Sequence, residues 1–497
     1  MSPQSGPGPH LSQDSIWSRT SQTKIVATVG PACGTVEKLV ELIRAGVDVF
    51  RINTAHGDRA GHENYLRLVR EAETIAGQPV AVLVDLGGPK MRLGALPGGQ
   101  MTCRSGDTVR FIRGEVAREP LELCCTYPTL LEELRPDDRI MLADGVVSLR
   151  VQTVTPDTAE CLVVQGGTVR DKQGINLPGV KLTAPSLSDR DRATAQWAAS
   201  GATDIGGGVD FLSLSFVRRV EDVLELRRLV EETASEVQIV AKIEKPEALT
   251  NIEGIIAVAD AIMVARGDLG VEVDIAEMAV TQKRIVGLCR TLQKPVIIAT
   301  QMLDSMHHSR LPTRAEATDV ANAILDGADA CMLSGETAVG DYPVEAVQMM
   351  HRIALATEPL SREFERAPKS LTRIAGITRV TASTAQATVR LAEELDAKLI
   401  VVATASGRAA LAVSQNRSRI PTIGVSPSTA ILRRLALYRG VIPVPNAPTA
   451  DMLTLRDFVV KEATAAGLLK RNDRIVLLSW TGKGSSRHNQ ISVHEVE

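Results

Sequence analysis

Eight short apolar runs recur along the chain, and stretches with helical periodicity follow most of them. The runs are rich in apolar and β-branched residues and end in polar ones, as is typical of strands buried on both faces of a parallel sheet. Some follow a small-residue turn such as Ala-Gly-Val-Asp at 45–48, which suits a connection from a helix to a strand. The runs cover residues 24–30, 47–53, 80–86, 211–217, 238–244, 261–267, 295–301 and 330–336.

Eight alternating β/α units predict a (β/α)8 TIM barrel and therefore an α/β fold class. We expect residues 21–88 and 184–357 to form this barrel. A doubly wound open sheet is the alternative, because periodicity alone does not show that a sheet closes.

The third β/α unit is interrupted by a segment of different character. Between residues 89 and 183, alternating runs and Gly/Pro turns predict a small all-β domain inserted into a barrel loop. Gly87, Gly88 and Pro89 supply one side of a hinge, so the insert is well placed to act as a lid. Residues 372–497 alternate helices and strands and predict a C-terminal α/β domain, whereas the Ser-, Pro- and Gly-rich residues 1–20 predict a disordered tail.

Composition excludes several classes of function. The 497 residues carry a net charge of −3 and 3% aromatic residues, which argues against nucleic acid as a partner. We expect no membrane association, since no uncharged apolar stretch reaches the length of a membrane span. The seven cysteines are scattered and lack a zinc-type spacing, so we expect reduced thiols and a cytoplasmic location.

Charged residues close two neighbouring runs of the predicted barrel. Lys242 and Glu244 are two apart and therefore point to the same face of a strand, and Asp268 ends the next run. A cation and two carboxylates at neighbouring strand ends suggest a metal-assisted site that handles an anion. The alternative is an internal ion pair at the barrel rim, which the cost of burying charge disfavours. Other polar residues fall at the same predicted ends: Arg51, Asn53, Asp85, Ser215, Arg266, Thr300, Gln301, Ser334 and Glu336.

Six stretches in order along the chain resemble motifs of the pyruvate kinase family. They are residues 23–32 (TKIVATVGPA), 239–244 (IVAKIE), 263–270 (MVARGDLG), 300–303 (TQML), 312–316 (PTRAE) and 332–337 (MLSGET). The resemblance runs from about residue 23 to the C-terminus, and its inserted and C-terminal domains agree with the organisation above. It implies transfer of a phosphoryl group from phosphoenolpyruvate to ADP, giving pyruvate and ATP, the last step of glycolysis.

The resemblance also implies roles for individual residues. Lys242, Arg51 and Thr300 would be catalytic, and the same three residues with the backbone of Gly267 and Asp268 would bind phosphoenolpyruvate. Mg²⁺, with Mn²⁺ as an alternative, would bind Glu244 and Asp268. Positions on the nucleotide and monovalent-cation side of the site would be Asn53, His56, Asp85, Lys90 and Arg92.

Two departures from the family pattern concern the monovalent cation. Most members need K⁺, which would rest partly on a serine where this chain has Ala55, and Lys90 stands where a carboxylate is usual. An ε-ammonium can deliver a positive charge to nearly the place of a K⁺. We therefore predict that K⁺ is not required, because Lys90 replaces its charge and is able to pair with Asp85. The alternative is that Lys90 is a solvated hinge residue and that K⁺ still binds through the remaining oxygens.

The predicted C-terminal domain carries a candidate effector loop. Thr404, Ser406, Gly407 and Arg408 follow a strand directly and suit a phosphate cradle, although a plain helix start capped by Thr404 or Ser406 is an alternative. Residues 481–486 are a candidate second loop and Arg456 a weaker candidate. The resemblance implies a phosphorylated allosteric effector and a homotetramer.

Two rival functions remain open at this point. One is another metal-dependent barrel enzyme of phosphoenolpyruvate or pyruvate, such as an aldolase or lyase, which would not need Lys242. The other is a catalytically silent regulator that binds sugar phosphates through the C-terminal domain.

Overall fold

The computed structural model describes residues 21–143, 145–180, 182–201, 208–360, 377–449, 451–479 and 490–497. The predicted tail at 1–20, the start of the predicted C-terminal domain at 372–376 and the candidate loop at 481–486 lie outside these residues. None of the described helices combines the length and the apolar composition that a membrane span requires.

Eight parallel strands close into a barrel, which confirms the predicted fold class. Closure is made by β1, which pairs on one side with β2 (Val26 beside Val49) and on the other with β16 (Lys24 beside Ala330). The strands lie in the order β1-β16-β15-β14-β13-β12-β3-β2. Their bounds are β1 (Lys24–Thr28), β2 (Val49–Asn53), β3 (Ala81–Asp85), β12 (Phe211–Leu214), β13 (Gln238–Ile243), β14 (Ala261–Ala265), β15 (Val296–Ala299) and β16 (Ala330–Leu333).

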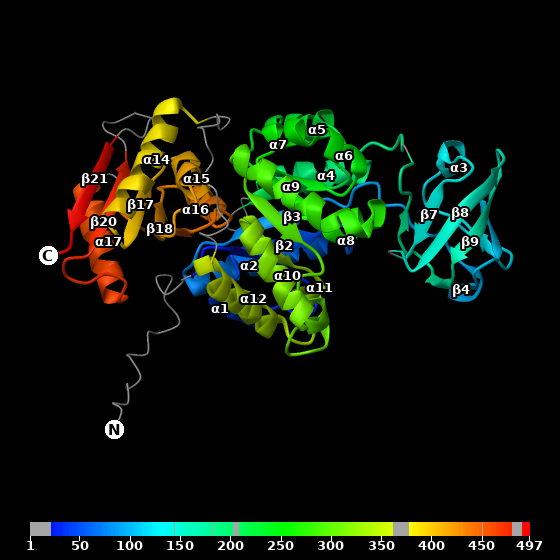
Figure 1. Ribbon diagram of the computed structural model, residues 1–497, viewed down its shortest axis with the longest axis horizontal. Helices are drawn as coiled ribbons and strands as arrows, with labels where there is room; N and C mark the ends of the chain where they lie inside the picture. Colours follow the sequence, from blue (N-terminus) through cyan, green and yellow to red (C-terminus); the bar gives the residue numbers. More distant parts are fainter. Residues whose placement is uncertain are drawn as a thin grey trace, which may run out of the picture.

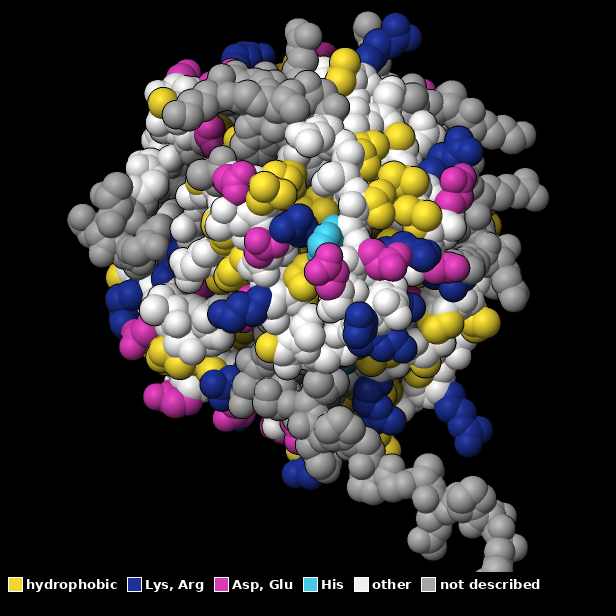
Figure 2. Space-filling model, turned by 90° about the vertical axis from the view of Figure 1, so that its left-hand side faces the viewer, with side chains coloured by type: hydrophobic (Ala, Val, Ile, Leu, Met, Phe, Trp, Pro, Cys, Tyr) yellow, Lys and Arg dark blue, Asp and Glu magenta, His cyan; other side chains and the backbone are white. Residues whose placement is uncertain are grey.

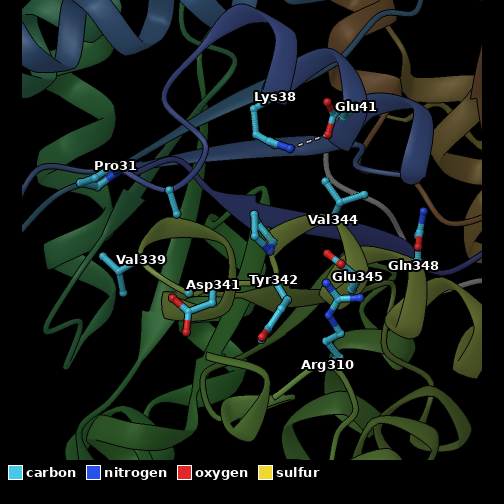
Figure 3. A pocket seen from close by; sticks show the side chains of 13 residues that line it. Pro31, Lys38, Glu41, Arg310, Val339, Asp341, Tyr342, Val344, Glu345 and Gln348 are labelled. Carbon is cyan, nitrogen blue, oxygen red and sulfur yellow. Dashed lines mark hydrogen bonds and ion pairs between the residues drawn. The ribbon is translucent and has the colours of Figure 1, made fainter. Parts of the chain in front are cut away.

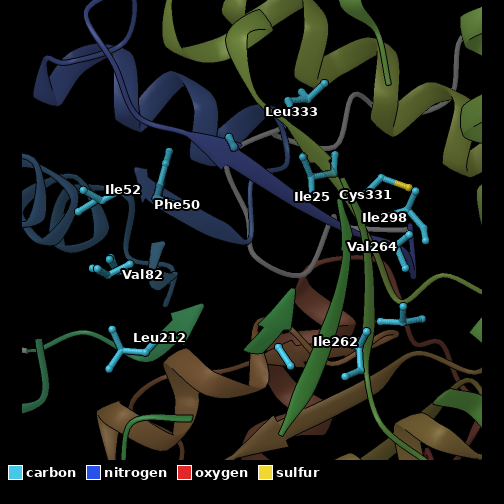
Figure 4. Packing of buried hydrophobic residues seen from close by; sticks show 14 of the residues in the cluster. Ile25, Phe50, Ile52, Val82, Leu212, Ile262, Val264, Ile298, Cys331 and Leu333 are labelled. Carbon is cyan, nitrogen blue, oxygen red and sulfur yellow. The ribbon is translucent and has the colours of Figure 1, made fainter. Parts of the chain in front are cut away.

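The two faces of each barrel strand carry different side chains. Residues such as Phe50, Ile52 and Val82 belong to the core between the strands and the helices (Figure 4). Burying a side chain of this size contributes about 1.5–3 kcal/mol. Because successive residues alternate between faces, Arg51 lies on the opposite, interior face of β2 from Phe50 and Ile52. The apolar core thus fixes which polar residues face the barrel interior.

Helices surround the barrel, and local sequence explains where several begin and end. Thr35 caps α1, and Gly46 ends this helix with φ 126°, a value that favours glycine. Thr313 and Glu316 form a reciprocal capping box at the start of α10. The helices are α1 (Val36–Ala45), α2 (Arg59–Ala76), α4 (Asp189–Ala199), α5 (Val220–Glu231), α6 (Pro246–Thr250), α7 (Ile252–Val258), α8 (Arg266–Glu272), α9 (Met278–Thr291), α10 (Arg314–Asp326), α11 (Gly335–Ala338) and α12 (Pro343–Thr357), with 3₁₀ turns η4 (Ile275–Glu277), η5 (Asp304–His307) and η6 (Glu358–Leu360).

Between β3 and α4 the chain forms the inserted β structure, which lies beside the barrel at the right of Figure 1. Its own hydrophobic core includes Phe111, Leu149 and Cys161. A six-stranded sheet has the order β11 (Ile175–Asn176), β7 (Arg139–Leu142), β8 (Val147–Val154), β9 (Thr158–Gln165), β5 (Thr108–Ile112) and β6 (Glu122–Leu123); a second sheet pairs β4 (Gln100–Cys103) with β10 (Gly167–Arg170), and η2 (Pro97–Gly99) and α3 (Leu130–Glu133) complete the insert.

The C-terminal α/β domain covers the amino ends of the barrel strands. Lys24 Nζ at the start of β1 donates to the carbonyl of Val441 at 2.6 Å, and Arg433 forms an ion pair of 2.7 Å with Glu73. The domain holds a sheet of order β19 (Val441–Pro443), β18 (Thr422–Val425), β17 (Leu399–Ala403), β20 (Arg474–Ser479) and β21 (Gln490–Glu495), with helices α14 (Arg379–Glu394), α15 (Arg408–Gln415), α16 (Thr429–Leu435) and α17 (Met452–Ala465). Acidic, basic and hydrophobic side chains are mixed on the face of this end that Figure 2 shows.

Candidate active site

Lys242 lies at the centre of a buried charge cluster at the carboxyl ends of the barrel strands. Its Nζ is 2.7 Å from Glu244 Oε1 and 3.4 Å from Asp85 Oδ1, and it donates a hydrogen bond of 2.8 Å to Ser215 Oγ. Three strands therefore contribute to one group, because Lys242 belongs to β13, Asp85 ends β3 and Ser215 follows β12.

Arg51 approaches the same cluster from β2. Its Nε and Nη2 donate to Asp85 Oδ2 at 2.8 and 2.6 Å, and its Nη1 donates to Thr28 Oγ1 at 3.1 Å. Two N–H groups on one carboxylate oxygen fix the plane of the guanidinium. Asp85 thus positions two cations, Arg51 and Lys242, beside the same volume.

The pKa values of the cluster follow from burial and from these neighbours. Burial lowers the pKa of Lys242, but Asp85, Glu244 and Asp268 raise it above the usual value for lysine. Burial raises the pKa of Asp85, but Lys242 and Arg51 bring it below the usual range. Burial raises the pKa of Glu244 and Lys242 opposes this, whereas the negative charge of Asp268 adds to it, so the net pKa is raised.

Asp268 and Thr300 lie on the neighbouring strand ends. Asp268 sits in the first turn of α8, directly after β14, close enough to act on the pKa of both Lys242 and Glu244. The Thr300 hydroxyl accepts a hydrogen bond of 2.7 Å from Gly267 N and donates one of 2.7 Å to the carbonyl of Ala299. Thr300 has φ 70°, which is unfavourable for a β-branched residue. Strained backbone of this kind is frequent at functional sites.

Glu244 and Asp268 are suited to hold a divalent cation that takes its remaining ligands from substrate and water. Glu244 is buried with Lys242 Nζ 2.7 Å from its Oε1, and the repulsion between the two carboxylates favours an added cation. Among the described residues no group of three or more His, Cys, Asp and Glu side chains is placed to hold a metal. Two carboxylates plus ligands from substrate and water are the usual set for Mg²⁺.

A positively charged region borders the cluster. Burial lowers the pKa of His56, and the charges of Arg92, Lys90 and Arg51 lower it further, so these side chains share one region. His56 and Lys90 are exposed, whereas Asn53 accepts a hydrogen bond of 3.2 Å from the amide of Ala55. Such a region suits the phosphates of a nucleotide.

Comparison with known proteins identifies the family. Residues 20–347 match the family described as pyruvate kinase, barrel domain, and residues 382–494 match pyruvate kinase, alpha/beta domain. The chain belongs to the pyruvate kinase family. A pyruvate kinase of Geobacillus stearothermophilus is 41% identical over 96% of this chain and 80% of its own length, and one of Mycobacterium tuberculosis is 40% identical over 96% and 99%. A crystal structure of a pyruvate kinase from Cryptosporidium parvum has a TM-score of 0.86, with 31% identity and 98% of each chain covered.

These matches establish the enzyme class that the resemblance implied. The chain is an enzyme of the pyruvate kinase family, so neither the aldolase or lyase alternative nor the silent regulator is supported.

One predicted contact at the site is not formed. Among the described residues, the ion pairs of Asp85 are those with Arg51 and Lys242, and Lys90 forms none. The predicted pairing of Lys90 with Asp85 is therefore absent from this structure, because Asp85 is buried inside the barrel mouth while Lys90 is exposed after the hinge glycines.

Two of the strand-end residues, Arg266 and Glu336, hold the barrel mouth together. Arg266 pairs with Asp319 at 2.7 Å, and Glu336 accepts hydrogen bonds from the amides of Leu303 and Ser334. Both residues are satisfied within the protein.

Sequence reasoning gave no role to Thr28 or Phe216. Thr28 orients Arg51, and Phe216 donates its backbone N–H to Glu244 Oε2 at 3.2 Å. Neither is charged. The sequence signal for both is only their position at the end of a barrel run.

The candidate effector loop lies between β17 and α15. Ser406 and Arg408 are exposed, whereas Thr404 is fully buried and its hydroxyl accepts from Gly407 N at 3.0 Å. The N-cap of α15 is Gly407, with φ 77° and no side-chain cap, so the alternative of a helix capped by Thr404 or Ser406 is wrong. Thr404 therefore stabilises the loop, because its hydroxyl is already hydrogen-bonded to the backbone. Arg456, the weaker candidate, forms an ion pair of 2.7 Å with its neighbour Asp457.

A separate cavity of about 810 Å³ lies outside the strand-end cluster (Figure 3). Basic and acidic side chains both line it, including Lys38, Arg310, Asp341 and Glu345. Lys38 is paired with Glu41 at 2.6 Å. The predicted site residues are not among those that line this cavity.

Proposed function

We propose that the strand-end cluster transfers the phosphoryl group of phosphoenolpyruvate to ADP and then protonates the enol of pyruvate. The bond between phosphorus and the enol oxygen breaks, a bond to a β-phosphate oxygen of ADP forms, and a proton is added to the methylene carbon. The observation that carries the proposal is the buried Lys242 between Asp85 and Glu244, a fixed cation at a site for an anionic group.

Lys242 and Arg51 stabilise the transferring group. Both are held by Asp85 before substrate arrives, so little reorganisation is needed at the moment of transfer. Burial strengthens their interaction with a phosphoryl group relative to water. Phosphoryl transfer depends mainly on such positioning and charge neutralisation.

Glu244 and Asp268 are the residues that would hold a divalent cation, Mg²⁺ with Mn²⁺ as an alternative. When bound, the ion neutralises charge on the oxygens of the substrate. The burial of Glu244 and the repulsion between the two carboxylates support this assignment.

Thr300 and Gly267 orient the other end of the substrate. A threonine hydroxyl is a weak acid, so we assign Thr300 the task of ordering the water that protonates the methylene carbon. The amides of Gly267 and Asp268 bind the substrate carboxylate. Gly267 N donates to Thr300 in this structure, so carboxylate binding exchanges one oxygen acceptor for another.

Lys90 supplies the charge that K⁺ provides in most of the family. Ala55 lacks the hydroxyl that would contribute to a K⁺ site, and the charge of Lys90 already acts on His56. Because Lys90 is not paired with Asp85 here, we assign its ammonium to the phosphates of ADP on the nucleotide side, with Asn53 and Arg92. On this account activity does not require K⁺.

The C-terminal domain binds a phosphorylated activator at the loop of Thr404, Ser406, Gly407 and Arg408. Exposure of Ser406 and Arg408 next to the left-handed Gly407 supports a phosphate site there.

We propose a homotetramer, as the family resemblance implies, and two exposed apolar side chains support further contacts between copies of the chain. The edge strand β21 has Val493 45% exposed, and Ile275 beside α9 is 76% exposed, so each surface suits a second copy of the chain. Light scattering measures the assembly. All seven cysteines are free and buried, which suits the reducing conditions of the cytoplasm.

The proposed reaction is tested by pyruvate formation in mixtures that each lack one component. The full mixture holds the protein, phosphoenolpyruvate, ADP and Mg²⁺. Pyruvate should form only in that mixture, with ATP in equal amount. Formation of pyruvate without ADP would contradict phosphoryl transfer and favour hydrolysis.

A further inference from the structure

A buried ion pair is formed by two residues that lie close in the chain to the proposed metal carboxylates. Lys245 Nζ is 2.6 Å from Glu272 Oε1, and the two side chains are only 6% and 2% exposed. A buried pair of this kind costs desolvation energy, so it is weak evidence for a gain in stability alone. Its place in the fold indicates what else it does.

The ion pair joins the two elements that carry Glu244 and Asp268. Lys245 follows Glu244 in the chain, at the end of β13. Glu272 is four residues after Asp268 on α8, so the two lie about one turn apart on the same side of that helix. A bond between Lys245 and Glu272 therefore fixes how far β13 stands from α8.

Phe216 completes the arrangement from a third element. Its ring centroid is 5.1 Å from Lys245 Nζ, and its N–H donates to Glu244 Oε2 at 3.2 Å. Phe216 has φ 56°, a left-handed value that a bulky residue rarely adopts. The strained backbone thus aims one donor at a carboxylate oxygen.

We propose that Lys245, Glu272 and Phe216 form a carboxylate clamp that sets the spacing and orientation of Glu244 and Asp268, and hence the affinity of the site for a divalent cation. They are positioning residues, since they act through the two carboxylates. The proposal rests on the proposed role of Glu244 and Asp268 as metal ligands. Outer partners of this kind typically change metal affinity about 10- to 100-fold when they are lost.

Phe216 of the clamp also contacts the chain on both sides of the inserted domain, at Gly88 before it and at Ser186 after it. A Cβ on Gly88 would lie 2.6 Å from the Phe216 ring, so glycine is required for this approach. On the returning chain, Ser186 Oγ donates to the carbonyl of Phe216 at 2.9 Å. Phe216 therefore links the chain at the start and end of the inserted domain to Glu244.

Binding of Mn²⁺ to the full-length protein without substrate, followed by electron paramagnetic resonance, tests the clamp independently of turnover. Lys245→Met combined with Glu272→Leu removes both charges and leaves neither partner unpaired. We expect the Kd for Mn²⁺ to rise about tenfold or more. The same exchange at Lys283 and Asp326, an ion pair between α9 and α10, should leave the Kd unchanged.

Two further variants separate failure of the clamp from failure of the metal site. Glu244→Gln should weaken Mn²⁺ binding in an otherwise intact protein; if it does not, the proposed metal site is wrong and the clamp with it. If Glu244→Gln weakens binding while the clamp exchange leaves the Kd at the parent value, only the clamp is wrong. Should the double exchange not fold, Glu272→Gln takes its place with the same expectation, and Lys245→Arg, which keeps the ion pair, should bind Mn²⁺ like the parent.

Discussion

Lys242 in β13 and Glu244 directly after this strand meet at its carboxyl end, where Lys242 Nζ lies 2.7 Å from Glu244 Oε1. The pair joins two tasks of the proposed reaction, since one side chain neutralises the phosphoryl group and the other holds the divalent cation. A cation on Glu244 would compete with Lys242 for the carboxylate. We therefore expect cation binding to leave the Lys242 ammonium more available to the substrate.

The pKa of His56 depends on the charged side chains on the nucleotide side of the proposed site. Burial lowers its pKa below the ordinary value of 6.5, and Arg92 and Lys90 lower it further. The unfolded chain therefore binds a proton more readily, so this histidine reduces stability as pH falls through 6.5 and makes no such contribution above it. Lys90→Glu should raise the pKa measured by NMR, as should bound ADP with Mg²⁺. An unchanged pKa in Lys90→Glu, equal to that in the distant control Lys38→Glu, would contradict the placement of Lys90.

Independence from K⁺ is tested by initial rates in tetramethylammonium buffers with and without KCl at matched ionic strength. We expect nearly equal rates, because Lys90 supplies the charge. Lys90→Glu together with Ala55→Ser should lower the rate without K⁺ and restore a response to it. A rise of about tenfold in the parent protein on adding K⁺, equivalent to roughly 1.4 kcal/mol in the barrier, would contradict the assignment.

The effector loop is tested by thermal shift with a panel of sugar phosphates and nucleotides. An activator should raise the melting temperature of the parent, because a ligand that binds only the folded state stabilises it. Arg408→Ala should lose most of that shift, whereas Arg456→Ala should keep it. Equal shifts in the parent and Arg408→Ala would reject the loop as the phosphate site.

Buried ion pairs join the barrel to the C-terminal domain, and Glu73 is the residue to test. It lies 2.7 Å from Arg433 and 3.2 Å from Arg70. Glu73→Gln should lower the free energy of unfolding by about 3 kcal/mol, because it removes a buried carboxylate that pairs with both Arg433 and Arg70. Glu41→Gln, at an exposed pair with Lys38, should cost less than about 1 kcal/mol. Calorimetry of both variants checks the difference, and equal melting temperatures would contradict it.

The barrel could be predicted because the sequence patterns that indicate its strands are local. Each strand needs a short β-branched run, and eight of them with helices between leave few other folds. The predicted runs extend past the observed strands; the first, for example, ends at Thr28 instead of residue 30, because the strand ends carry the site loops. Charge made Lys242, Glu244 and Asp268 candidates for the site, since ionisable residues that end apolar strands are rare without a task.

The contacts that depend on tertiary geometry could not be predicted. Lys90 is close to Asp85 in the chain, but the left-handed Gly88 between them directs Lys90 to the surface. Phe216 gives no chemical signal, because its contribution is a backbone N–H aimed by a strained φ. The ion pair of Lys245 with Glu272 spans 27 residues and depends on how β13 and α8 pack.

The central claim is that Lys242 stabilises the transition state of phosphoryl transfer. Lys242→Met keeps the length of the side chain and removes its charge, and Lys38→Met is the matched exchange at a half-buried lysine outside the site. Steady-state kinetics with saturating ADP and Mg²⁺ should show kcat lowered on the order of 10³-fold or more in Lys242→Met, with KM for phosphoenolpyruvate changed far less. A kcat near the parent value with only KM raised would make Lys242 a ground-state binding residue and contradict the account.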